Sequence, residues 1–245
     1  MALSRGLLGE VVRHEIESPF VHLTVTGLGG SGLEPRVPPT RRVLGQLEGL
    51  IEVLGGQPER VLWRFDPIVA GAMTAASFEG IAAVLGGLGV RTCIISFPAQ
   101  RSLEGPLDAQ YQRFGIRRWS RVDKRDFSLR LGDIASRCGL ELRACCQPQL
   151  LGDCAGALRP AACISAELAT RLHPRRLPFD PAKDPHQRRH CHCVVSHDIG
   201  KYTDRCGSGC AYCYSSAGGP EPAVAAGEGE AAPDGPRGGV SSGSG

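Results

Sequence analysis

Short apolar runs that suit β-strands alternate with longer stretches of helical spacing along most of this chain. The strand-like runs cover residues 21–26, 61–65, 91–97 and 140–145. Helices are expected at 40–54, 74–88 and 126–137, and Ser165 can cap a short helix that reaches Leu172. Strands that alternate with helices pair in parallel through right-handed crossovers, and four such units are too few to close an eight-stranded barrel. We therefore expect an α/β fold whose parallel sheet forms a partial (β/α) barrel or stays an open sheet.

The C-terminal end of the chain differs in composition from the rest. Residues 217–245 consist almost only of Gly, Ala, Pro, Ser and acidic residues. Such a segment cannot bury enough apolar surface to offset the entropy of an unfolded chain. We expect one domain over residues 20–216, preceded by a lead-in segment at 1–19 and followed by a disordered tail at 217–245.

Composition narrows the class of protein. Hydrophobic residues make up 42% of the chain, and no apolar run approaches the roughly 18–20 residues of a membrane-spanning helix. The N-terminal segment contains Glu10, Glu15 and Glu17 and lacks the apolar stretch of a signal peptide. We expect a cytoplasmic protein without a membrane partner, and an organellar location stays open. The net charge of +3 suits anionic ligands but falls short of the basic balance that indicates nucleic-acid binding.

The eleven cysteines are distributed unevenly. Five of them crowd into one segment: Cys191, Cys193, Cys206, Cys210 and Cys213. Disulfide frameworks are typical of small secreted chains, which this is not. The crowding therefore predicts a metal or iron–sulfur site.

The spacing of Cys206, Cys210 and Cys213 is CxxxCxxC. Three thiolates from one short loop can take three irons of a 4Fe–4S cluster and leave the fourth iron open. Gly207 and Gly209 allow the tight, positive-φ backbone that a wrapping loop needs. An open iron can bind S-adenosylmethionine and deliver the electron that cleaves it to a 5′-deoxyadenosyl radical.

Two alternatives to a cluster remain at this point. The thiols could be inert and buried. Otherwise they could form a tetrahedral zinc site, with ligands drawn from Cys191, Cys193, Cys206 and Cys210 and from His190, His192 or His197.

Segment 187–214, with its CxC and CxxxCxxC spacings, resembles the C-terminal signature of the uncharacterised family called domain of unknown function 1848. Thr26-Gly27, the run WRFDPI at 63–68 and the run CIISF at 93–97 resemble that family as well. The likeness extends from about Phe20 to Tyr214. It implies a radical S-adenosylmethionine-like protein whose cluster loop is C-terminal, with a 4Fe–4S cluster and S-adenosylmethionine as cofactors. If the protein is catalytic, the likeness also implies a ferredoxin or flavodoxin as electron donor.

Family members typically begin with further strand–helix units, one with a Ser-Arg-Arg-Thr-Asp-like segment and one with a Trp-Thr-Lys-Asn-Pro-like segment. Neither segment occurs in this sequence. The resemblance therefore implies that the family's N-terminal part is missing here.

Strand ends supply candidate cofactor-binding residues. Thr26, Arg64 and Asp66 end two predicted strands, and the carboxyl ends of parallel strands form the ligand-facing edge. Alternatively, Arg64 and Asp66 form an internal ion pair, or Asp66 and Pro67 set a turn.

Four further thiols match family cysteines and have the count for a second cluster or a zinc site: Cys145, Cys163, Cys191 and Cys193. Alternatively, Cys145 packs as a strand residue and the CxC pair only borders the loop.

A basic and aromatic stretch follows the third predicted strand. Charge and stacking could together hold a nucleic-acid strand there, although we favour a solvated helix face with its aromatic rings turned to the core. The residues are Tyr111, Arg113, Phe114, Arg117, Arg118, Trp119 and Arg121.

The function expected from sequence is a radical S-adenosylmethionine-like enzyme of unknown substrate, and the alternative is a non-catalytic iron–sulfur or zinc protein.

Overall fold

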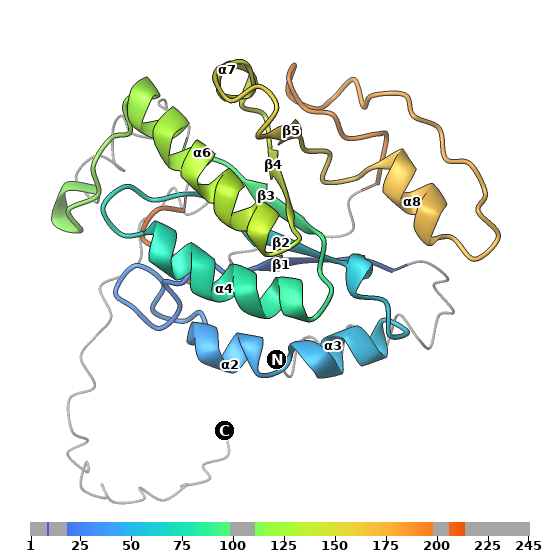
Figure 1. The fold of residues 1–245 in the computed structure, drawn as a ribbon, viewed down its shortest axis with the longest axis horizontal. Coiled ribbons are helices and arrows are strands. Elements are labelled where there is room, and N and C mark those ends of the chain that lie inside the picture. Colours follow the sequence, from blue (N-terminus) through green and yellow to red (C-terminus); the bar gives the residue numbers. More distant parts are fainter. Residues whose placement is uncertain (1–8, 10–18, 99–110, 198–205, 214–245) are drawn as a thin grey trace, which may run out of the picture.

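The computed structural model describes residues 9, 19–98, 111–197 and 206–213, and these build an α/β domain around a parallel sheet (Figure 1). The strand order is β1-β2-β3-β4-β5, and every neighbouring pair is parallel. The strands are β1 (Val21–Thr24), β2 (Val61–Phe65), β3 (Thr92–Ile95), β4 (Glu141–Ala144) and β5 (Arg159–Pro160). The predicted α/β class and parallel sheet are confirmed. The lead-in, the tail, and residues 198–205 and 214 of the predicted loop lie outside the described residues, except for residues 9 and 19.

Most of the helices follow the predicted alternation. They are α2 (Thr40–Leu44), α3 (Leu47–Val53), the 3₁₀ turn η1 (Pro58–Arg60), α4 (Ala75–Gly87), α6 (Arg121–Arg137), α7 (Pro148–Asp153) and α8 (Ala166–Leu172). The single helix expected at 40–54 is divided into α2 and α3 at Gly45 and Gln46. Helix α6 begins at Arg121 rather than near 126, because the hydroxyl of Ser120 accepts a hydrogen bond from the Asp123 amide and caps the helix there.

One face of the sheet carries the main core. Trp63 and Phe65 of β2 point to this face, where both rings pack on Phe78 of α4 with centroids 4.8 and 5.0 Å away. The Trp63 indole nitrogen donates to the Val25 carbonyl at 2.9 Å, so this buried polar group is satisfied. Helix α6 packs beside α4 and closes the layer (Figure 1). Each fully buried large side chain contributes roughly 1.5–3 kcal/mol.

The opposite face of the sheet carries a smaller apolar cluster. Leu62 and Ile94 pack there with Leu168 and Leu172 of α8. The Arg60 guanidinium donates to the Leu172 carbonyl at 3.0 Å and thus ties the end of α8 to the start of β2. Residues alternate between the two faces along each strand, and this alternation decides which strand residues can meet the segments that follow α8.

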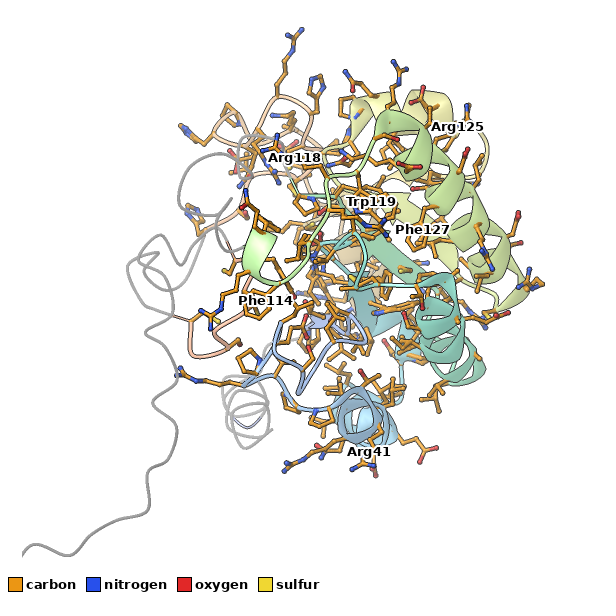
Figure 2. The ribbon with its side chains drawn as sticks, turned by 90° about the vertical axis from the view of Figure 1, so that its left-hand side faces the viewer. Arg41, Phe114, Arg118, Trp119, Arg125 and Phe127 are labelled. Atoms are coloured by element: carbon orange, nitrogen blue, oxygen red, sulfur yellow. The ribbon has the colours of Figure 1, made fainter. Side chains whose placement is uncertain are left out.

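The basic and aromatic stretch is partly internal. Trp119 packs against Phe97 and Phe127 and donates to the Ile68 carbonyl at 3.0 Å (Figure 2). Tyr111 is buried, whereas Arg118 is exposed. The rings of Tyr111 and Trp119 thus pack against the core. Among the described helices, none is long and apolar enough to cross a bilayer.

Candidate metal centre

The segment 206–213, which we call the cysteine loop, is docked at the carboxyl end of β1. Tyr212 lies between two of the loop's cysteines and donates its hydroxyl proton to the buried carboxylate of Glu34. The same carboxylate oxygen accepts a hydrogen bond from the Thr26 hydroxyl at 2.6 Å. The Ala211 amide adds a hydrogen bond to the Leu33 carbonyl at 2.9 Å. These contacts fix the loop at the edge of the sheet where ligands of parallel α/β folds bind.

The loop presents its three thiols with different exposure. Cys206 is exposed, and Cys210 and Cys213 are half-buried. The other two thiols lie close enough to act electrostatically on Cys210, and Gly209 has the positive φ of 62° that the sequence predicts for the turn between them. Burial raises the pKa of the Cys210 thiol, and the nearby Glu34 carboxylate raises it further. A metal that binds this sulfur must therefore displace a firmly held proton.

The donor set of the loop consists of three thiols on one short segment. Within the described ranges, no group of three or more His, Cys, Asp or Glu side chains is arranged to hold one metal ion. In a 4Fe–4S cluster each thiolate would take its own iron, and three thiolates would leave one iron open.

A second group of thiols occupies the carboxyl edge further along the sheet. The sulfur atoms of Cys145 and Cys163 are 4.0 Å apart. The Cys163 thiol is also a hydrogen-bond partner of Cys193, which in turn is a partner of Cys191. Cys146 is a partner of both Cys191 and Cys145, so the contacts return to their starting point. Each thiol therefore has two thiol neighbours, and we call the closed set of five the thiol ring.

Three parts of the fold supply the ring. Cys145 directly follows β4, Cys163 follows β5, and Cys191 and Cys193 come from the segment after α8. The backbone of Cys146 has a φ of 51°, which a non-glycine residue adopts at a cost of about 1–3 kcal/mol. This conformation allows two consecutive cysteines to contribute to one cluster of side chains.

The predicted second site is thus partly assembled and partly different. Cys145, Cys163, Cys191 and Cys193 come together, and Cys146, which sequence reasoning left among the scattered cysteines, joins them. The only sequence signal for Cys146 is its place beside Cys145 at a strand end. Of the cysteine ligands of the zinc alternative, Cys191 and Cys193 belong to the ring, and Cys206 and Cys210 belong to the loop.

Contact and burial favour the protonated form of three ring thiols in the metal-free protein. The hydrogen bond with Cys145 raises the pKa of Cys163 to about 11, and burial adds to the effect. Contact with Cys163 and burial raise the pKa of Cys193. Burial raises the pKa of Cys146, although Arg188 acts in the opposite direction. A metal that binds these three thiols must displace their protons.

Polar side chains at the strand ends link the two cysteine groups to the sheet. Arg64 forms an ion pair with Asp66, whose other carboxylate oxygen accepts a hydrogen bond from Ser96. Burial alone would lower the pKa of Arg64, but the Asp66 carboxylate outweighs it and raises this pKa. Arg64 also donates to the Cys163 sulfur at 3.6 Å. The internal Arg–Asp pair left open by the sequence is therefore present, and the guanidinium also contacts the ring.

A family model matches residues 7–215, a span that includes both cysteine groups and the whole sheet. The chain belongs to the family described as domain of unknown function (DUF1848). No curated protein and no solved structure matches it.

The remaining cysteines of this DUF1848 chain lie elsewhere. Cys93 is fully buried within β3, and burial raises its pKa well above the usual value. Cys154 is buried beyond α7 and donates to the Arg125 carbonyl at 3.7 Å. Cys138 is half-buried at the end of α6. None of the three belongs to the loop or the ring as the structure describes them.

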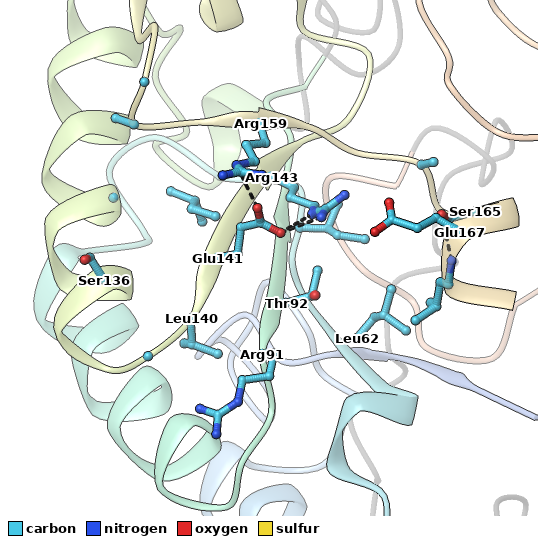
Figure 3. A pocket seen from close by; sticks show the side chains of 18 of the residues that line it. Leu62, Arg91, Thr92, Ser136, Leu140, Glu141, Arg143, Arg159, Ser165 and Glu167 are labelled. Atoms are coloured by element: carbon cyan, nitrogen blue, oxygen red, sulfur yellow. Dashed lines mark hydrogen bonds and ion pairs between the residues drawn. The ribbon is translucent and has the colours of Figure 1, made fainter. Parts of the chain in front are cut away.

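Two cavities among the described residues differ in their position relative to the cysteines. A cavity of about 670 Å³ opens over the first residues of β3, β4 and β5, at the amino end of the sheet. There Arg143 and Arg159 both pair with Glu141 (Figure 3). The smaller cavity of about 290 Å³ lies at the carboxyl edge and is lined by Cys146, Trp119 and Lys124. The sheet edge with the cysteines, rather than the larger cavity, is the candidate centre, because only that edge gathers thiols.

Proposed function

We propose that this DUF1848 protein binds a 4Fe–4S cluster through Cys206, Cys210 and Cys213 and acts as a radical S-adenosylmethionine-like enzyme. The observation that carries the proposal is the docking of a three-thiol loop, through Tyr212 and Glu34, at the carboxyl edge of a parallel sheet. Three thiolates leave one iron without a protein ligand. When bound, such a cluster supplies the electron that cleaves S-adenosylmethionine to a 5′-deoxyadenosyl radical.

The chain's own residues would hold and orient the two cofactors. The contact of Tyr212 with Glu34 fixes the turn that carries Cys210 and Cys213. Thr26 contributes through the same carboxylate, and its buried hydroxyl positions the loop rather than contacting S-adenosylmethionine. Arg64 stays charged at the end of the next strand and can bind the carboxylate of that cofactor, with Asp66 orienting the guanidinium.

Electron delivery needs an exposed face. Cys206 is exposed, so a small donor protein can approach the loop from its side. We propose a ferredoxin or flavodoxin as this partner. The radical source does not define the substrate, which stays open.

The proposal is tested with anaerobically reconstituted full-length protein, a chemical reductant and S-adenosylmethionine. We expect 5′-deoxyadenosine from the wild type and none above background from the variants Cys206→Ala, Cys210→Ala and Cys213→Ala. The matched control is Cys138→Ala, which removes a half-buried thiol outside both groups and should keep full activity. An iron-loaded wild type that never cleaves the cofactor would favour the non-catalytic iron–sulfur protein instead.

A further inference from the structure

We propose that the thiol ring binds a second iron–sulfur cluster, separate from the cluster proposed for the cysteine loop. The ligands that we assign are Cys145, Cys163, Cys191 and Cys193. Four thiolates saturate a 4Fe–4S cluster, so this centre has no open iron for a substrate. Its chemistry is therefore electron transfer or structural support rather than cofactor cleavage.

The shape of the ring favours a cluster over a single ion. Each of the five thiols contacts two others, and these contacts close on themselves. Five thiols are more than the four that one tetrahedral ion takes. Among the described residues, no group of three or more His, Cys, Asp or Glu side chains is arranged to hold a single ion. A cube places its irons between the thiolates.

Hydrogen-bond donors already point at three of the assigned sulfurs. The Ile164 amide donates to Cys193 at 3.4 Å, and the Cys193 amide donates to Cys191 at 3.4 Å. The Arg64 guanidinium donates to Cys163 at 3.6 Å. N–H groups directed at sulfur stabilise the negative charge that thiolates carry when they bind iron, and they also tune the potential of a cluster. A neutral thiol core has no need of a guanidinium.

Access to a cavity separates one of the five thiols from the four assigned ligands. Cys145, Cys191 and Cys193 are at most 7% exposed, which shields a bound cluster from water and oxidants. Cys146 and Cys163 are both half-buried, but of the ring thiols only Cys146 lines the cavity of about 290 Å³. We assign Cys146 as the thiol that meets incoming iron at the cavity, not as a final ligand. On ligation each of the four ligand thiols releases its proton to solvent.

The deciding experiment removes the three thiols of the cysteine loop and leaves the thiols of the ring unchanged. The full chain with Cys206→Ala, Cys210→Ala and Cys213→Ala combined is reconstituted anaerobically with sulfide and equal amounts of ferrous and ferric iron, the ratio that a 4Fe–4S cluster of core charge 2+ contains. We expect about four irons and four sulfides per chain, and the Mössbauer spectrum of a 4Fe–4S cluster. In this background Cys163→Ser or Cys193→Ser should remove the iron, while the matched control Cys146→Ser should keep it. Circular dichroism of the metal-free proteins checks that each variant is folded.

The outcomes separate this inference from the proposed function. In one outcome the combined loop variant binds no iron while the wild type binds about four irons per chain. That result overturns the proposal of a second cluster and leaves the proposal of the loop cluster intact. A loop variant and a wild type that both bind about four irons, all lost in Cys193→Ser, support the ring and contradict the loop. A single zinc per chain that iron does not replace overturns the inference, as does loss of all iron in Cys146→Ser alone.

Discussion

The cysteine loop and the thiol ring use the same side chain in two different ways. The loop takes three thiols from one segment of eight residues, one of them exposed, and it is held in place by Tyr212 and Glu34. The ring takes five thiols from distant parts of the sequence, and most of them are buried. An incomplete, accessible set of ligands suits a reaction, whereas a complete and buried set suits storage or transfer of electrons. The comparison indicates that the number and burial of the thiols, more than their spacing, distinguish the two proposed functions, cofactor cleavage and electron transfer.

Arg64 connects the two regions through the sheet. It lies at the end of β2, is paired with Asp66 and donates to the sulfur of Cys163 in the ring. The next strand, β1, leads into Thr26, which contacts the carboxylate that holds the loop. Neighbouring carboxyl ends of a parallel sheet therefore carry both cysteine groups. If both bind clusters as we propose, this edge provides a route for an electron from the buried cluster to the open one.

The largest effect is expected where one loop thiol is removed. Cys210→Ala should abolish formation of 5′-deoxyadenosine, a loss of at least about 100-fold, because a cube with two protein ligands is labile. Iron should fall from about eight to about four per chain, since the ring is untouched. Iron and sulfide analysis beside product chromatography measures both. Unchanged iron content in this variant would show that Cys210 is not a ligand.

Removal of a ring thiol should lower both the iron content and the melting temperature of the iron-loaded protein. In Cys193→Ser, about half of the iron should be lost, and the iron-loaded protein should melt roughly 6–12 °C lower, because about 3 kcal/mol or more of binding free energy disappears. The metal-free forms should melt within a few degrees of each other. Calorimetry with and without iron gives the comparison. Equal melting temperatures of the loaded wild type and loaded variant would contradict a cluster in the ring.

The docking contact of the loop should have an intermediate effect. Tyr212→Phe removes the hydroxyl that donates to buried Glu34, at a cost of about 1–3 kcal/mol. A chelator should then extract loop iron about 5- to 100-fold faster, while ring iron leaves at the wild-type rate. Cys138→Ala changes a half-buried thiol outside both cysteine groups, so it is the control and should release loop iron at the wild-type rate. Equal extraction rates in Tyr212→Phe and Cys138→Ala would leave the contact without a role in holding the cluster.

The smallest effect concerns pH and the metal-free ring. The Cys163 pKa is raised from an ordinary value of 9.0 to about 11 in the fold, so the native state binds more protons than the unfolded state between these values. Stability linked to this thiol is therefore full below pH 9 and is lost as the pH rises toward 11. The wild type should lose about 1–2 kcal/mol more than Cys163→Ser across this range. Urea unfolding at several pH values tests this, and parallel curves for the two proteins would refute the shift.

Most of the fold could be predicted from local patterns in the sequence. The apolar run at 61–65 matches β2 at both ends, and Ser165 caps α8 as expected, because each of these signals depends on adjacent residues. Strand β5 was missed since it has only two residues, one of them Pro160. The break between α2 and α3 at Gly45 was also missed, because apolar spacing continues across it.

The two cysteine groups also differ in how far they could be predicted from local sequence. The loop was readable because its thiols are close in sequence, and Gly209 showed where the backbone must turn. The ring depends on strands β4 and β5 ending side by side, which brings Cys145 to Cys163. For Cys146 the one local signal is its place beside Cys145, because its positive φ appears only in the folded chain. The pairing of Tyr212 with Glu34 was likewise invisible, because 178 residues separate the two partners.

The most direct test of the account is the paramagnetic resonance spectrum of the reduced, reconstituted full-length protein with and without S-adenosylmethionine. Binding to an open iron at the cysteine loop should change the spectrum of the wild type and of Cys193→Ser. The spectrum of the combined Cys206→Ala, Cys210→Ala and Cys213→Ala variant should not respond to the cofactor. A wild-type spectrum that ignores S-adenosylmethionine, or a loop variant that still responds to it, would contradict the central claim that Cys206, Cys210 and Cys213 hold a cluster with an open iron.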